Sequence, residues 1–143
     1  MAEIRPLQAL RYRDKAGDIA SLTCPPYDII PPAQREELLR RSPYNVVRLE
    51  LPQGDDPYGE AGRTLSQWLE EGILAPDMDP GLYIYEEEFL TQVDRGEKKK
   101  LRGLVCRVRL EDFSNGVVLP HEETLSKAKE DRFQLMQATH CNF

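Results

Sequence analysis

The clearest pattern of apolar and polar positions along the chain is a helical repeat in residues 56–72. Its apolar and aromatic side chains recur with the spacing of one helix face: Tyr58, Ala61, Leu65, Trp68 and Leu69. Asp56 is a suitable N-cap, Pro57 fits the first helical position, and Gly72 would end the helix. Because the stripe contains the only tryptophan of the chain, we expect it to form a large part of the core.

Two further helices are predicted from their end signals. Residues 31–41 begin with two prolines, which a first helical turn tolerates, and Leu38 and Leu39 are the expected anchors. Near the end of the chain, Ser126 is a suitable N-cap for a helix that should run to about Thr139.

Alternation with a period of two predicts strands elsewhere. Residues 45–51, NVVRLEL, combine this alternation with β-branched residues and are interpreted as a strand. Residues 82–90 and 103–111 alternate in the same way and are joined by a polar segment with a glycine. We expect them to form a long hairpin of two half-buried antiparallel strands. Residues 3–12 are read as a short extended segment, which Pro6 confines to an edge or a bulge.

The charged runs of this hairpin are predicted to pair with each other. Acidic residues 86–88 would lie near the basic run 98–102, as a solvated ladder of cross-strand pairs. We favour that interpretation over a metal or phosphate site. Further along, Asn115-Gly116 is a turn signal that returns the chain into residues 117–120.

Together these elements predict an α+β fold, with an antiparallel or mixed sheet and about three helices packed against it. A chain of 143 residues has the size of one domain with one hydrophobic core, so residues 1–143 are expected to form a single domain.

Composition narrows the classes of partner. A net charge of −6 opposes the phosphate neutralisation on which nucleic-acid affinity depends, so no nucleic-acid partner is expected. No segment approaches the roughly 20 apolar residues of a membrane span, which disfavours a membrane partner. The three cysteines are far apart and include no CxxC pair, which fits a reducing compartment and therefore a cytoplasmic location.

The most informative segment for chemistry is the predicted C-terminal helix. At about 100° per residue, its apolar arc comprises Leu125, Ala128, Leu135 and Met136, with Phe133 at the edge. Lys129 and Arg132 fall inside this arc. Cations on a core-facing arc are costly unless they extend to solvent, pair with carboxylates, or face a cleft that holds an anionic ligand.

Two interpretations of these cations remain open. In the structural one, they extend to solvent or pair with Glu122, Glu123 or Asp28. In the functional one, a small anion such as phosphate binds at the start of the helix, where free N–H groups favour negative charge. Its ligands would be Ser126, Lys127, Lys129 and Arg132, while His121 or Glu122 handles protons or contacts a metal.

No metal site is assigned, because His121-Glu122 lacks the second histidine of a zinc-protease helix motif; position 125 is Leu. The proline-locked loop CPPYD could instead present Tyr27 and Asp28 to a ligand, or it could be a structural turn. Cys24 in the same loop could be a nucleophile, but no clear base lies near it in the sequence, and packing is the commoner role of a lone cysteine.

Four segments in order resemble the prokaryotic family called domain of unknown function 1015. They are CPPYDII at 24–30, NVVRLELP at 45–52, WLEEGIL with LYIYEEEF within 68–89, and LPHEETLSKAKEDR at 119–132. The resemblance covers nearly the whole chain. Members of the family are about three times as long, which implies that this chain corresponds to the N-terminal portion of a longer protein.

The resemblance also implies a function. A glycine-histidine-histidine-arginine element further along the family is similar to nucleotide-handling loops of the ParB and sulfiredoxin superfamily, which includes free-serine kinases. Family members tend to be encoded near serine-biosynthesis enzymes. The implied activity is nucleotide-dependent phosphotransfer, with Mg²⁺, to a small hydroxy amino acid such as serine, and this portion alone is expected to be inactive. The alternative is a non-catalytic binding or assembly module for an anionic metabolite or a protein partner.

Overall fold

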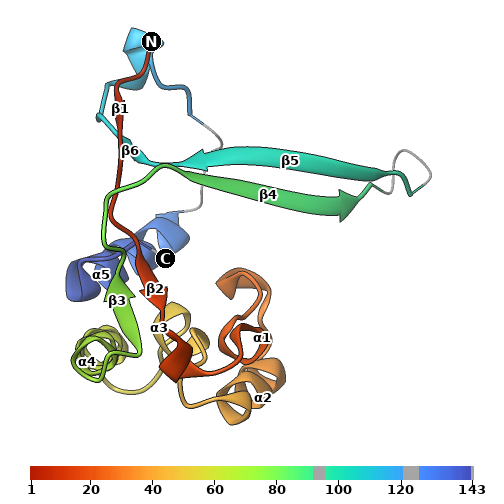
Figure 1. The fold of residues 1–143 in the computed structure, drawn as a ribbon, viewed down its shortest axis with the longest axis vertical. Helices are drawn as coiled ribbons and strands as arrows, with labels where there is room; N and C mark the ends of the chain where they lie inside the picture. Colours follow the sequence, from red (N-terminus) through yellow and green to blue (C-terminus); the bar gives the residue numbers. More distant parts are fainter. Residues whose placement is uncertain (92–95, 121–125, 143) are drawn as a thin grey trace. The chain divides into compact units, whose positions relative to one another are not determined.

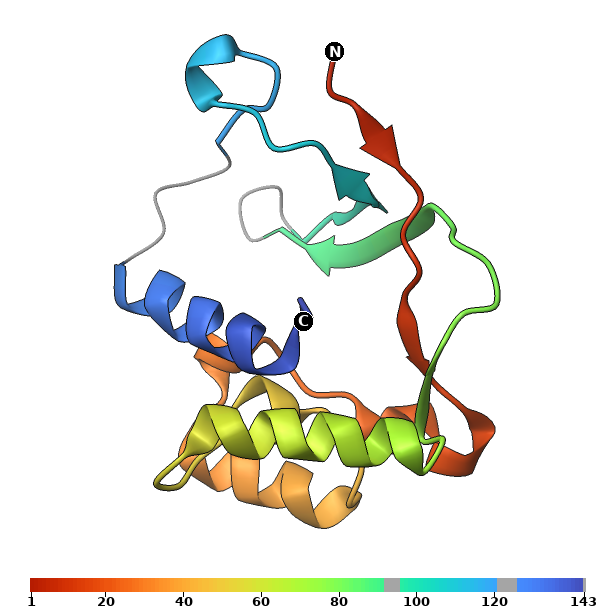
Figure 2. The same cartoon turned by 90° about the vertical axis from the view of Figure 1, so that its left-hand side faces the viewer.

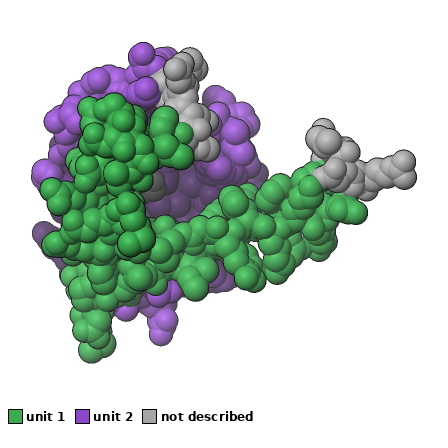
Figure 3. All heavy atoms as spheres, turned by 90° about the horizontal axis from the view of Figure 1, so that it is seen from above, with its two compact units in different colours: residues 1–9, 76–122 green, residues 10–75, 123–143 purple. Residues whose placement is uncertain are grey.

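The computed structural model describes residues 1–91, 96–120 and 126–142. The chain divides into two compact units, one formed by residues 1–9 and 76–122 and the other by residues 10–75 and 123–143 (Figure 3). Helices and antiparallel strand pairs are both present, so the predicted α+β class is confirmed (Figure 1).

The predicted helix over residues 57–71 forms as α4, Pro57–Glu70. Asp56 caps it, because its carboxylate accepts a hydrogen bond of 3.1 Å from the backbone N–H of Gly59. Gly72 follows with a φ of 67°, the left-handed conformation that glycine adopts at low cost. Ala61, Leu65 and Trp68 of the predicted stripe are buried, whereas Leu69 at its edge remains exposed.

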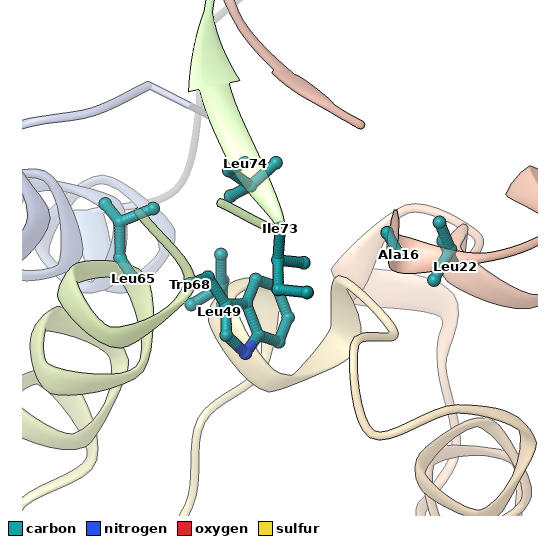
Figure 4. Close-up of a cluster of buried hydrophobic side chains, with 7 residues drawn as sticks. All are labelled: Ala16, Leu22, Leu49, Leu65, Trp68, Ile73 and Leu74. Carbon is teal, nitrogen blue, oxygen red and sulfur yellow. The ribbon is translucent and has the colours of Figure 1, made fainter. Parts of the chain in front are cut away.

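Trp68 lies in the main cluster of buried side chains of the second unit. Figure 4 shows its ring beside Leu49 and Ile73, in a cluster that also includes Ala16, Leu22, Leu65 and Leu74. The rings of Tyr12 and Tyr44 pack against the indole, with centroid distances of 6.1 Å and 5.9 Å. The cluster therefore joins α4 to side chains from several other segments of the sequence.

Helix α5, Ser126–Thr139, lies along α4 (Figure 2). Residues 121–125, directly before it, lie outside the described residues, so the N-cap role of Ser126 stays a prediction. A Cβ on Gly62 of α4 would lie 2.7 Å from the carbonyl oxygen of Ala138, which means that the two backbones approach too closely for a side chain there. Leu135 supplies the buried apolar contact of α5.

The helix predicted over residues 31–41 forms as α2, Pro32–Arg41. Leu38 is fully buried, and Leu39 is partly buried against the same small cluster, which contains Ile30 and Val47. In the part of the chain that the structure describes, α2, α4 and α5 are the long helices; α1, Ile19–Leu22, and α3, Val47–Glu50, are single turns.

The strand predicted over residues 45–51 was wrong, because this segment contains α3. The reason lies in Asn45, whose side chain is completely buried. Its amide donates to the carbonyl oxygens of Ser21 and Thr23, and its side-chain oxygen accepts from the N–H of Val47, which starts the helical turn. These contacts outweigh the β propensity of the neighbouring valines.

The predicted hairpin is confirmed as β4, Tyr83–Leu90, paired antiparallel with β5, Lys98–Val105. The acidic and basic runs face each other, with Glu86 opposite Arg102 and Glu88 opposite Lys100. Glu86 accepts hydrogen bonds of 2.8 Å from Arg102 and 3.0 Å from Lys100, so the predicted charge ladder is also confirmed.

Two details of the hairpin prediction were wrong. The second strand begins at Lys98 rather than at residue 103, because the basic run itself forms the ladder with the glutamates. The strands are also not half-buried: nearly every residue of β4 and β5 is exposed, since the pair forms a sheet of two strands only. A strand pair without a covering layer leaves both of its faces accessible.

The remaining strands are short. Pro6 separates β1, Ile4–Arg5, from β2, Leu10–Tyr12, as expected for the extended segment over residues 3–12. β1 pairs antiparallel with β6, Arg107–Val108, and β2 pairs with β3, Leu74–Pro76. The predicted turn at Asn115-Gly116 ends a 3-10 turn, Phe113–Asn115, with Gly116 at a φ of 63°.

We expect the change Trp68→Ala to lower the free energy of unfolding by about 3–5 kcal/mol, because it leaves a large cavity among side chains that cannot fully collapse. Chemical denaturation followed by circular dichroism measures this. The matched control is Leu69→Ala on the exposed side of the same helix, which should cost about 1 kcal/mol or less. Equal losses of unfolding free energy in the two variants would contradict the conclusion that the Trp68 side chain is a main contributor to the core.

Candidate functional site

The side chain of Arg132 on α5 lies at the centre of a half-buried charge cluster. Its Nη1 donates to Oε2 of Glu50 at 3.2 Å, and its Nη2 donates to the backbone carbonyl of Glu50 at 2.8 Å. Nε and Nη2 also donate to Oδ2 of Asp131, at 2.9 Å and 2.6 Å. The exposed fractions of the Arg132 and Glu50 side chains are 27% and 21%, so solvent screens this pair less than a surface pair.

The loop CPPYD contributes an aromatic side chain to the cluster. The guanidinium carbon of Arg132 lies 3.8 Å from the centre of the Tyr27 ring, a cation–π contact. Pro25 and Pro26 restrict the backbone just before Tyr27, and the chain then forms a 3-10 turn over Tyr27–Ile29. Proline rigidity thus holds the ring over the cation.

Glu50 is the last residue of α3, and its carboxyl group is half-buried beside Arg132. Burial raises the pKa of its carboxyl, and the positive charge of Arg132 offsets only part of this effect. On the other side of the guanidinium, Oδ1 of Asp131 accepts a hydrogen bond of 2.9 Å from the hydroxyl of Tyr58 on α4. The cluster therefore connects α3, α4, α5 and the CPPYD loop.

Cys24 lies in the same region but is not activated. Burial, followed by the negative charge of Glu50, raises the pKa of its thiol to about 11. Burial also raises the pKa of Tyr12, whose hydroxyl donates to the carbonyl oxygen of Tyr44 at 2.7 Å. A thiol that stays protonated near neutral pH is a weak nucleophile, which favours the packing role for Cys24.

The structure separates the predicted site residues into three groups. Arg132 and Tyr27 come together, as described. Ser126, Lys127, Lys129 and Asp28 are exposed, and His121 and Glu122 lie outside the described residues. The placement of Lys129 on the core-facing arc was therefore wrong; the buried contact of α5 is centred on Leu135 and Thr139, and Lys129 faces solvent. Met136 is likewise exposed.

Arg132 forms ion pairs with carboxylates, as the structural interpretation of the two cations expected. The acids are Glu50 and Asp131, neither of which was considered. Glu50 was missed because the strand interpretation of residues 45–51 gave no reason to place it near the C-terminal helix. The available signal was an acidic residue between two leucines, Leu49 and Leu51, five residues after an asparagine that starts a turn.

Within the described ranges, no helix has both the length and the apolar character needed to cross a membrane. The same ranges contain no group of three or more histidine, cysteine or acidic side chains arranged to hold a metal ion.

The fold and the site define an α+β protein with a half-buried ion-pair cluster where three sequence motifs meet: CPPYDII, NVVRLELP and LPHEETLSKAKEDR. The chain matches the family model described as "Protein of unknown function (DUF1015)" over residues 4–143. Since the match covers nearly the whole chain, the protein belongs to this family, and the resemblance seen in the sequence is confirmed. No curated protein and no solved structure matches the chain.

We expect alkylation of Cys24 by iodoacetamide to accelerate about tenfold per pH unit from about pH 7 to about pH 10 without levelling off. A raised pKa means that the thiolate fraction is still increasing throughout this range. Peptide mass spectrometry gives the rate at this residue. A short unstructured peptide with one cysteine is the reference, since a thiol with the ordinary pKa of about 8.5 levels off above roughly that pH. A plateau for Cys24 at that pH would contradict the buried environment.

The change Arg132→Met should lower the free energy of unfolding by about 2 kcal/mol, less than the roughly 3–5 kcal/mol lost when a fully buried pair is broken. The reason is that Glu50 would remain half-buried without its partner. Thermal denaturation and urea titration measure this loss. Lys129→Met, which removes an exposed cation from the same helix, is the control and should have little effect.

A double-mutant cycle with Glu50→Gln isolates the pairwise contribution. A coupling energy near zero would show that the two side chains do not stabilise the fold through each other.

Proposed function

We propose that this chain contributes the acceptor- and phosphate-binding part of a nucleotide-dependent phosphotransferase that acts on a small hydroxy amino acid such as serine. The observation that carries the proposal is the convergence of three separate motifs on one cluster: Tyr27 from the first, Glu50 from the second and Arg132 from the third. Segments that only pack a core would not need to bring an arginine, a carboxylate with a raised pKa and an aromatic ring together.

Arg132 acts in this proposal mainly by orienting its neighbours. A guanidinium has five N–H donors. Nε and Nη2 use theirs on Asp131 and on the carbonyl of Glu50, and Nη1 uses one on the Glu50 carboxylate. One N–H of Nη1 is left without a partner among the described residues, and it is available to the carboxylate of an amino acid. The bound acids keep the cation rigid, which lowers the entropy cost of binding.

Glu50 is suited to accept a proton. A half-buried carboxylate with a raised pKa is a stronger base than an exposed one, and a phosphotransferase needs a group that receives the proton of the attacking hydroxyl. In the proposed step, the hydroxyl oxygen of the acceptor forms a bond to the terminal phosphorus of the nucleotide. The bond to the leaving nucleoside diphosphate breaks, and the proton passes to Glu50.

The exposed cations of α5 supply the proposed phosphate contacts. Lys127 and Lys129 face solvent in the first turns of the helix, next to Ser126 and at the end where the helix dipole favours anions. Asp28 is exposed in the CPPYD loop and would contact the ammonium group of the amino acid. His121 and Glu122 remain proposed for proton transfer or contact with the Mg²⁺ that accompanies a nucleotide.

Since this portion alone is expected to be inactive, the test uses the longer protein to which it corresponds, incubated with adenosine triphosphate, Mg²⁺ and serine, with O-phosphoserine detected by mass spectrometry. We expect Glu50→Gln to lower the transfer rate by about 100-fold or more, because the proton acceptor is lost. We expect Lys127→Gln and Lys129→Gln to raise the KM for the nucleotide with a smaller effect on kcat. Lys98→Gln on the hairpin removes another exposed cation and should change neither constant.

Thermal shift gives an independent readout of binding. A ligand at 100 times its dissociation constant stabilises the folded state by about 2.7 kcal/mol. In the longer protein, absence of a shift with adenosine triphosphate, serine and phosphoserine, together with absence of transfer, would contradict the proposal.

The second candidate function is a non-catalytic module that binds an anionic metabolite or a protein partner. The saturation of most Arg132 donors by protein acids favours it, because such a residue supports a rigid binding surface as well as an active site. In the longer protein, a thermal shift without any phosphoserine formation, equal with Glu50 and with Glu50→Gln, would select this candidate. The three free cysteines support a reducing, cytoplasmic setting for either function.

A further inference from the structure

The short strand pair β1–β6 carries an unusual concentration of arginines on one face. Ile4 pairs with Val108 and Arg5 with Arg107, and the N–H of Arg109 donates to the carbonyl oxygen of Glu3 at 2.9 Å. Side chains alternate between the two faces of a strand. One face therefore carries Glu3, Arg5, Arg107 and Arg109, and we call this set the arginine ribbon.

The pairing within the arginine ribbon is electrostatically unfavourable. Arg5 and Arg107 stand directly opposite each other, an arrangement of like charges that destabilises a strand pair. The three guanidinium groups have two carboxylates close by, Glu3 and Glu111, whose Oε1 lies 3.7 Å from Nε of Arg109. One positive charge is therefore in excess here, although the chain as a whole has a net charge of −6. Such a local excess of positive charge calls for an anion to balance it.

Internal contacts hold the three arginines in different ways. Glu3 bridges two of them, since its Oε1 accepts from Nη2 of Arg5 at 2.7 Å and its Oε2 accepts from Nη1 of Arg109 at 3.3 Å. Arg107 donates only through Nε, to the carbonyl oxygen of Pro6 at 2.8 Å. Within residues 1–91, 96–120 and 126–142, its two Nη atoms have no acceptor, so four N–H donors remain on a guanidinium whose position is already set.

These side chains line a cleft of about 360 Å³, together with Val108. A volume of this size lies at the lower end of the roughly 300–1,000 Å³ typical of small-molecule sites. Guanidinium groups bind phosphate through paired N–H donors, which makes arginine the preferred residue where several phosphate oxygens must be contacted.

We propose that the arginine ribbon binds the phosphate group of a small soluble molecule, with the free Nη atoms of Arg107 as the main donors and with Arg5 and Arg109 balancing the remaining charge. This site is separate from the Arg132 cluster and shares no residue with it. Because Arg5 and Arg109 are 72% and 68% exposed, binding is expected to weaken strongly as the salt concentration rises.

Isothermal titration of the whole chain with inorganic pyrophosphate at low ionic strength tests the proposal. We expect Arg107→Gln to weaken binding at least tenfold, and Arg107→Lys to weaken it as well, since lysine keeps the charge but loses the paired donors. Arg63→Gln is the matched control. Arg63 is a similarly exposed arginine on α4 with two acidic partners, and its removal should leave the affinity unchanged.

A second readout keeps the test decisive if a change at Arg107 disturbs β6. Arg5→Gln and Arg109→Gln alter exposed side chains and should each weaken pyrophosphate binding several-fold, while the melting temperature stays within a few degrees of the parent. In nuclear magnetic resonance spectra, the Nε–Hε signal of Arg107 should shift on addition of pyrophosphate, and that of Arg63 should not.

Separate outcomes distinguish this site from the proposed function. Lys127→Gln and Lys129→Gln should leave the Arg107 signal response intact, even if they abolish phosphotransfer. Titration with O-phosphoserine and with vesicles of phosphatidylcholine and phosphatidic acid identifies the source of the phosphate. Affinity for the vesicles alone, absence of pyrophosphate binding, or equal affinity in Arg107→Gln and Arg63→Gln would each overturn the inference.

Discussion

The half-buried guanidinium of Arg132 constrains the rest of the candidate site. A cation that is largely removed from water must have acceptors close by, and Glu50 and Asp131 provide them. Glu50 ends α3, and Tyr27 belongs to a proline-rich loop. The contacts that Arg132 needs therefore connect α5 to two segments that are distant from it in sequence. The same contacts give the cluster the three features on which the proposed function depends: an oriented carboxylate, a rigid cation and an aromatic face.

The position of Arg132 depends in turn on how α5 lies on α4. The absence of a side chain at Gly62 lets the backbones come together, and the hydroxyl of Tyr58 binds Asp131 across the same contact. Trp68 and the apolar side chains around it bury another part of α4 in the core cluster. Core packing and site geometry are therefore coupled in this unit through a single helix.

Local signals predicted well those elements whose stability is itself local. Capping and an apolar stripe were sufficient for α4, and complementary charges across a turn were sufficient for the hairpin β4–β5. Residues 45–51 could not be predicted in this way. Their alternation favours a strand in isolation, but the buried amide of Asn45 finds its acceptors in residues 21 and 23, which are distant in sequence. A tertiary hydrogen-bond network overrode the local preference.

The sequence by itself determined the family, the α+β class, the presence of cations on the last helix and the rigid loop that carries Tyr27. Only the tertiary structure decided which of those cations is used internally: Arg132 is half-buried between acids, whereas Lys129, three residues earlier, faces solvent. Helical periodicity gives the relative angle of two side chains, but the direction of the buried face is set by what packs against it. For α5 that partner is α4: Leu135 of the predicted arc is buried together with Thr139, whereas Met136 of the same arc is exposed.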